Sequence, residues 1–61
     1  MNEEISVEYQ GKIYTAEYSV IGDELTVYLP DGSTRSTFLT GGLKPETAAA
    51  THIKSYAKQN T

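Results

Sequence analysis

The sequence predicts an α+β fold, in which an antiparallel four-stranded β-meander is followed by one C-terminal helix packed on one face of the sheet (β-β-β-β-α). Apolar and polar residues alternate with a period of two over much of residues 1–40, which is typical of half-buried strands. Three tight-turn signals divide that stretch. From residue 45 onward the pattern is that of an amphipathic helix. We expect residues 1–61 to form one small domain.

Strands are expected at about residues 4–10, 12–21, 24–30 and 33–40. The three turns between them are Gln10-Gly11, Gly22-Asp23 and Asp31-Gly32. Each is interpreted as a two-residue loop, which fixes the register of the strands that it joins. The resulting registers place one apolar set on a single face: Ile5, Val7, Tyr14, Tyr18, Val20, Leu25, Val27, Leu29 and Phe38.

The helix is expected at about residues 45–58. Pro45 suits the first helical turn, where its missing N–H leaves no hydrogen bond unmade. Glu46 near the start and Lys58 near the end complement the helix dipole. On a helical wheel one stripe is apolar and should face the sheet: Ala49, Ala50, Ile53, Tyr56 and Ala57.

The net charge is −3, and it is unevenly distributed. Residues 1–40 hold seven acids and two bases, which gives −5, whereas residues 41–61 hold one acid and three bases, which gives +2. An acidic sheet repels phosphate backbones, so we expect no nucleic acid to bind it.

The composition also restricts the location of the chain. No apolar run is long enough to span a membrane. The acidic start, Met1-Asn2-Glu3-Glu4, differs from the basic and then apolar start of a secretory signal. The sequence has no cysteine, which excludes disulfides and fits a reducing compartment. We therefore expect a soluble cytoplasmic protein.

No residues form a convincing catalytic, cofactor or metal site. His52 is the single histidine and has no carboxylate beside it on the helix. Asp31 lies at the opposite end of the third strand from Asp23 and Glu24, so these acids do not converge on one cation. The glycines before the helix lack the spacing of a phosphate-binding loop. We expect no enzyme and no cofactor.

An interaction surface is the more promising feature. Tyr28 and Arg35 are expected on the open face of the sheet, and Ile21 and Leu39 at one end of it. The fourth strand, with Thr37 near its middle, should be an unprotected edge. The predicted surface therefore consists of Ile21, Tyr28, Arg35, Thr37 and Leu39.

The biological role is not specified by the sequence, and two functions are considered. The first is a small non-enzymatic protein-interaction module, for which a homodimer through the fourth-strand edge is also considered. The second is a nucleic-acid-binding domain that uses the sheet or the basic helix. The architecture of residues 12–57 broadly resembles the arm-type DNA-binding domains of tyrosine recombinases, without a shared motif. That resemblance implies that the sheet reads DNA. The sheet predicted here lacks the lysines and arginines that such a role needs.

Overall fold

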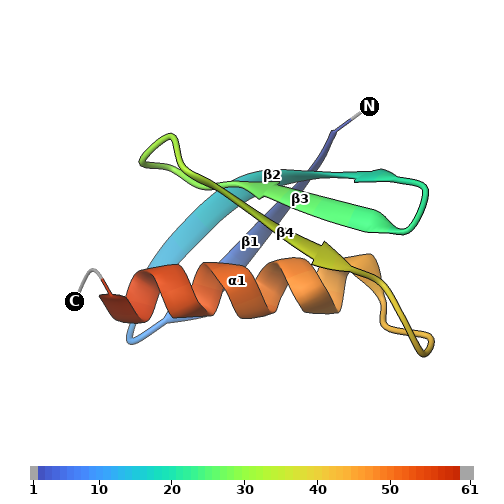
Figure 1. Ribbon diagram of the computed structural model, residues 1–61. Helices are drawn as coiled ribbons and strands as arrows, with labels where there is room; N and C mark the ends of the chain where they lie inside the picture. The colour runs from blue at the N-terminus through green and yellow to red at the C-terminus, as the bar shows by residue number, and fades with distance from the viewer. Residues whose placement is uncertain (1, 60–61) are drawn as a thin grey trace.

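In a computed structural model that describes residues 2–59, four antiparallel strands form one sheet in the order β1-β2-β3-β4, and one helix crosses beneath it (Figure 1). The elements are β1 (Glu3–Tyr9), β2 (Lys12–Ile21), β3 (Glu24–Tyr28), β4 (Thr34–Phe38) and α1 (Pro45–Gln59). The predicted α+β meander with one packed C-terminal helix is confirmed. The third and fourth strands are shorter than predicted.

The first two turns are two-residue loops, as predicted. Positive φ angles of 52° at Gln10 and 80° at Gly11 are those of a type I′ turn. Gly22, with φ of 61°, begins the second loop in the manner of a type II′ turn. The predicted pairs Ile5–Ala16, Val7–Tyr14, Tyr18–Val27 and Val20–Leu25 are all present.

The third turn has three residues, so the two-residue prediction for it is wrong. The Gly32 N–H donates to the Leu29 carbonyl at 3.0 Å, and the Leu29 N–H donates to the Ser33 carbonyl at 2.8 Å. Gly32 has φ of 91°, the left-handed conformation that completes a three-residue hairpin loop. A two-residue loop would need Pro30 to donate a backbone hydrogen bond to Ser33, and proline has no N–H.

The longer loop shifts β4 by one residue relative to the prediction. Leu25 pairs with Thr37 and Val27 with Arg35, whereas Phe38 and Ser36 were expected opposite them. Because side chains alternate between faces, this shift moves every β4 side chain to the other face. Phe38, expected in the core, is 67 % exposed instead.

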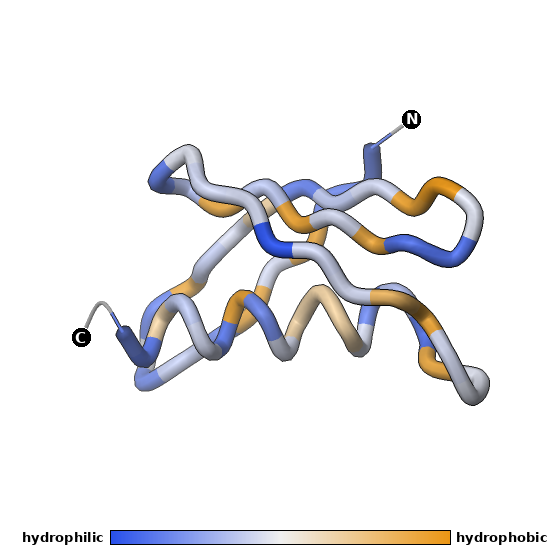
Figure 2. The backbone as a smooth tube through the Cα atoms, in the orientation of Figure 1, coloured by the Kyte–Doolittle hydropathy of each residue, from blue (hydrophilic) through white to orange (hydrophobic). Residues whose placement is uncertain are grey.

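The core lies between the sheet and α1. Its fully buried large side chains are Leu25, Val27 and Ile53. The remaining buried residues are Val7, Ala16, Leu29, Ala48, Ala49 and Ala57. Ala48 was not predicted, and the predicted members Ala50 and Tyr56 are only half-buried. The tube in Figure 2 shows how hydrophobic and hydrophilic segments alternate along the strands and α1.

An aromatic contact joins the sheet to the helix beside this core. The rings of Tyr14 on β2 and Tyr56 on α1 meet edge to face, with centroids 6.2 Å apart.

Within residues 2–59, no helix is both long and apolar enough to cross a membrane.

Candidate interaction surface

The sheet has one face covered by α1 and one that we call the open face. Three hydroxyl pairs join neighbouring strands across the open face: Ser6–Thr15 at 2.9 Å, Ser19–Tyr28 at 3.1 Å and Thr26–Ser36 at 3.3 Å. Such cross-strand pairs each stabilise a sheet by a few tenths of a kcal/mol, on the order of 0.2–1. Most of this face is therefore an ordinary solvated surface.

Its exception is an apolar row at the end of the sheet near the β2–β3 turn. Ile21 pairs with Glu24, and Glu24 pairs with Phe38, so the three side chains form one line across three strands. Ile21 is 80 % exposed and Phe38 67 %. Neighbouring strands are about 4.8 Å apart, which places the two apolar residues about 10 Å apart with a carboxylate between them. We call these three residues the Ile21–Phe38 row.

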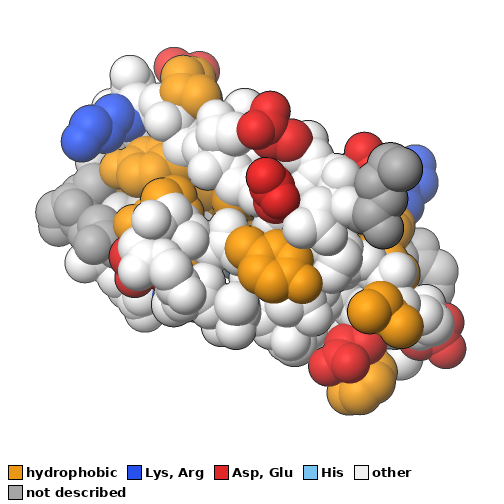
Figure 3. Space-filling model, turned by 90° about the horizontal axis from the view of Figure 1, so that it is seen from above, with side chains coloured by type: hydrophobic (Ala, Val, Ile, Leu, Met, Phe, Trp, Pro, Cys, Tyr) orange, Lys and Arg blue, Asp and Glu red, His pale blue; other side chains and the backbone are white. Residues whose placement is uncertain are grey.

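The open face is also acidic. Glu4, Glu8, Glu17 and Glu24 lie on it, and none of its strand residues is Lys or Arg. Seen from above in Figure 3, acidic and hydrophobic side chains are interspersed over the face, and basic side chains lie at its margins. Glu4 stands directly opposite Glu17, a destabilising arrangement. The Asn2 amide donates to Glu17 at 3.1 Å.

The predicted interaction residues do not all lie together. Ile21 and Tyr28 are on the open face, as expected. Arg35, Thr37 and Leu39 are not, because the register shift turns them toward α1. Phe38 takes the place that was predicted for Leu39. The sequence held a signal for this exchange, since Pro30-Asp31-Gly32 suits a turn with proline second and glycine at the left-handed position.

Arg35 and Thr37, which face α1 instead of solvent, attach β4 to the side of the helix. The Arg35 guanidinium donates to Ser55 Oγ at 3.1 Å and to Gln59 Oε1 at 2.8 Å. Thr37 Oγ1 makes a hydrogen bond with His52 Nε2. His52, Ser55 and Gln59 follow one another at helical spacing along one side of α1. These polar contacts therefore hold the last strand to the helix.

His52 takes part in this contact between β4 and α1. Burial lowers the pKa of its imidazole below 6.5, and the nearby Arg35 charge lowers it further. The neutral ring is therefore favoured in the folded protein. A neutral imidazole can still share a hydrogen bond with the Thr37 hydroxyl.

Asp31 is also explained by local structure. Its carboxylate accepts hydrogen bonds from the Ser33 hydroxyl at 2.6 Å and the Ser33 N–H at 2.9 Å. These bonds lower the pKa of the Asp31 carboxyl below 3.8, and they stabilise the third turn. Within residues 2–59, no three His, Cys, Asp or Glu side chains are arranged to hold a metal ion.

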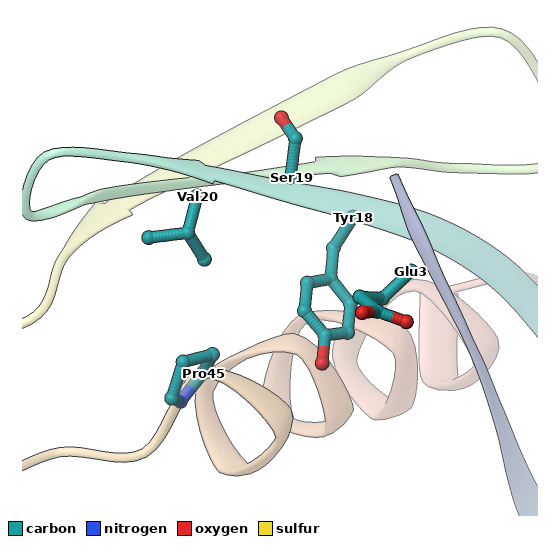
Figure 4. A pocket seen from close by; sticks show the side chains of 5 residues that line it. All are labelled: Glu3, Tyr18, Ser19, Val20 and Pro45. Carbon is teal, nitrogen blue, oxygen red and sulfur yellow. The ribbon is translucent and has the colours of Figure 1, made fainter. Parts of the chain in front are cut away.

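A recess of about 320 Å³ lies between the start of β1, the second half of β2 and the start of α1. Figure 4 shows the Tyr18 ring and the Glu3 carboxylate side by side in it, Val20 directed toward Pro45, and Ser19 directed away. The recess thus offers one carboxylate and one phenol hydroxyl beside two small apolar groups. The single histidine lies elsewhere, at the β4 side of α1.

The sequence was compared with protein-family models, curated proteins and solved structures, and none of them matched it.

Proposed function

We propose that this domain is a non-enzymatic protein-interaction module that contacts its partner through the Ile21–Phe38 row. The observation that carries the proposal is the exposure of Ile21 and Phe38, 80 % and 67 %, on one line of the open face. Large apolar side chains exposed on the same part of a surface are typical of binding sites. Phe38 offers an aromatic anchor of the kind that contributes strongly at interfaces.

The charge around the row restricts the partner's chemistry. Glu24 lies within the row, and three further glutamates lie on the same face. A partner that covers Ile21 and Phe38 must place a base or a hydrogen-bond donor against Glu24, because a buried unpaired carboxylate is costly. We therefore infer a partner segment with apolar residues flanking a lysine or arginine. The surrounding acids would accelerate its association at low salt.

Nucleic acid is a less suitable ligand. The register shift removes Arg35 from the open face, so that face presents carboxylates to any approaching phosphate. The basic residues of α1, among them Lys54, lie on the other side of the sheet. A catalytic role is also disfavoured, because His52 serves the contact between α1 and β4. The absence of cysteine supports a cytoplasmic location.

The test compares how well the wild type and two variants, one altered in the Ile21–Phe38 row and one altered elsewhere on the open face, capture binding proteins. The wild type, Ile21→Ser/Phe38→Ser and Ile13→Ser would each carry the same photocrosslinker at residue 19 and be exposed to extract of the native host. Ile13 is the matched control, because it is 63 % exposed on the same face but lies near the β1–β2 turn. A protein captured by wild type would then be purified and titrated against all three domains.

The double variant should weaken this binding at least tenfold, whereas Ile13→Ser should leave it within about twofold, since removing a central apolar anchor costs 2 kcal/mol or more. Binding should also weaken as salt rises. Equal affinity of the wild type and the double variant for a directly bound protein would remove the row from the proposal.

A further inference from the structure

We propose that two copies of this chain associate through their β4 edges, which pair antiparallel about a two-fold axis to join the two four-stranded sheets. This inference goes beyond the proposed partner site, because it rests on the backbone edge of β4. Phe38 belongs to both surfaces, whereas Ile21 belongs to the row alone. It follows from the hydrogen-bond register, the exposure of the edge and the contrast with the opposite edge.

The register determines which β4 backbone groups are free. The Leu39 N–H donates to the Asp23 carbonyl at 2.7 Å, which continues the β3–β4 ladder. In an antiparallel pair, alternate residues bond to the neighbouring strand. Thr37 therefore bonds to β3 in the same manner as Leu39, and so does Arg35. The N–H and C=O groups of Thr34, Ser36 and Phe38 point away from the sheet.

The outer side of β4 is available to a second strand. β4 is the last strand of the sheet, and α1 packs chiefly on β1, β2 and β3. Thr34, Ser36 and Phe38 are all exposed. None of the three is charged and none is a proline, and those are the usual means by which an edge strand resists pairing.

A second copy complements this edge at every position. Pairing centred on Ser36 places Ser36 against Ser36 of the second copy and Phe38 against Thr34 of the second copy. Each such pair exchanges two backbone hydrogen bonds. On the other face Arg35 stands opposite Thr37 of the second copy, so no like charges meet directly. The exposed Phe38 ring gains a threonine methyl group as a neighbour.

The β1 edge has the opposite character. Its two-residue turn makes Tyr9–Lys12 the closing hydrogen-bonded pair, which leaves the backbone groups of Glu4, Ser6 and Glu8 pointing outward. Self-pairing centred on Ser6 would place Glu4 against Glu8 of the second copy, twice over. Charge therefore protects β1, and it directs self-association to β4.

The expected dimer is weak. One pair of short strands buries less surface than the roughly 1,200–2,000 Å² of stable interfaces. We expect the mass measured by sedimentation equilibrium to rise from 6.7 kDa toward twice that value between about 10 and 500 µM, a range typical of weak association. A mass of 6.7 kDa throughout that range would overturn the proposal.

Two serines provide a matched pair of variants. Ser36→Pro removes an outward N–H from β4, and Ser6→Pro does the same on β1, and each also removes one exposed hydroxyl pair. Ser36→Pro should raise the dissociation constant at least tenfold, whereas Ser6→Pro and Ile21→Ser should change it less than twofold. Dimerisation of folded Ser36→Pro, or its loss in folded Ser6→Pro, would contradict symmetric β4 pairing.

A charge variant decides the matter if a proline variant fails to fold. Ser36→Lys places two ammonium groups opposite each other at the two-fold axis, and it should dissociate the dimer, whereas Ser6→Lys should not. Far-UV circular dichroism would establish that these variants are folded. A folded Ser36→Lys chain that dimerises like wild type would refute the pairing. The Ile21→Ser result separates this inference from the proposed partner site.

Discussion

The two faces of this sheet use similar residues for different purposes. On the covered face Leu25 and Val27 are completely buried, whereas on the open face Ile21 and Phe38 are largely exposed. Ile21, Leu25 and Val27 all occupy strands with clear period-two alternation. What separates them is α1, which lies along one face only (Figure 1). Alternation thus identifies a strand, but the covering element determines which apolar residues form the core.

The strongest test of this difference compares two isoleucines. Ile53 on α1 is fully buried, and Ile21 is 80 % exposed. Ile53→Ala should lower the free energy of unfolding by about 2–5 kcal/mol, because it leaves a cavity in a close-packed core. Ile21→Ala should change it by less than about 0.5 kcal/mol.

Urea denaturation followed by circular dichroism measures both variants. A domain of this size has a small margin of stability, so Ile53→Ala is expected to be largely unfolded at 25 °C. Similar unfolding midpoints for the two variants would show that α1 does not cover the sheet in this way.

A smaller effect should distinguish hydroxyls on the two faces. Thr37→Val removes the hydrogen bond to the partly buried His52 and should lower the free energy of unfolding by about 1 kcal/mol. Thr15→Val removes the exposed bond to Ser6, where water replaces the lost partner, so a change below about 0.5 kcal/mol is expected. Thermal melts of both variants measure the difference. A larger loss in Thr15→Val would argue against the observed β4 register.

The smallest expected effect is a dependence of stability on pH that arises from His52, on the covered side of the sheet. The pKa of His52 is lowered by burial and then by Arg35, so the unfolded chain binds the proton more readily. Its contribution to stability is therefore present above pH 6.5 and is lost as the pH falls through the folded pKa. Melting temperatures measured from pH 7.5 to 5 should fall more for wild type than for His52→Gln. Parallel curves would exclude this contribution.

Asp31 affects stability in a separate, more acidic pH range. The Ser33 hydrogen bonds lower its pKa, so its contribution is present above pH 3.8 and is lost in stronger acid. The titration of Asp31 therefore does not affect measurements above pH 5. This separation allows His52 to be examined alone.

The sequence predicted the fold class, the first two hairpins and the helix, because each rests on local chemistry. Gly11 and Gly22 suit two-residue loops, and the strands that they join alternate strongly, so turn and pattern agree. α1 begins at Pro45, as the proline predicts, and extends one residue beyond the expected end. The fold was thus largely accessible from the chain alone.

The fourth strand was predicted in the wrong register because it carries little alternation. Its residues on both faces are mostly hydroxylic, so a shift of one residue exchanges one polar set for another. Phe38 and Leu39 are adjacent apolar residues, and either would satisfy a core position. The hydrophobic pattern therefore could not select the register. The arrangement of the candidate site, which depends on β4, was mispredicted for the same reason.

The missing N–H of Pro30 has a consequence for the evolution of this surface. Substitution of Pro30 by threonine would supply the donor that a two-residue Asp31-Gly32 loop needs. Two registers of β4 would then compete, one that displays Phe38 to solvent and one that displays Leu39. A single substitution in a turn could thus exchange an aromatic for an aliphatic contact on the exterior without altering any residue of that exterior. Binding preference would in that case change through backbone chemistry at a distance from the partner.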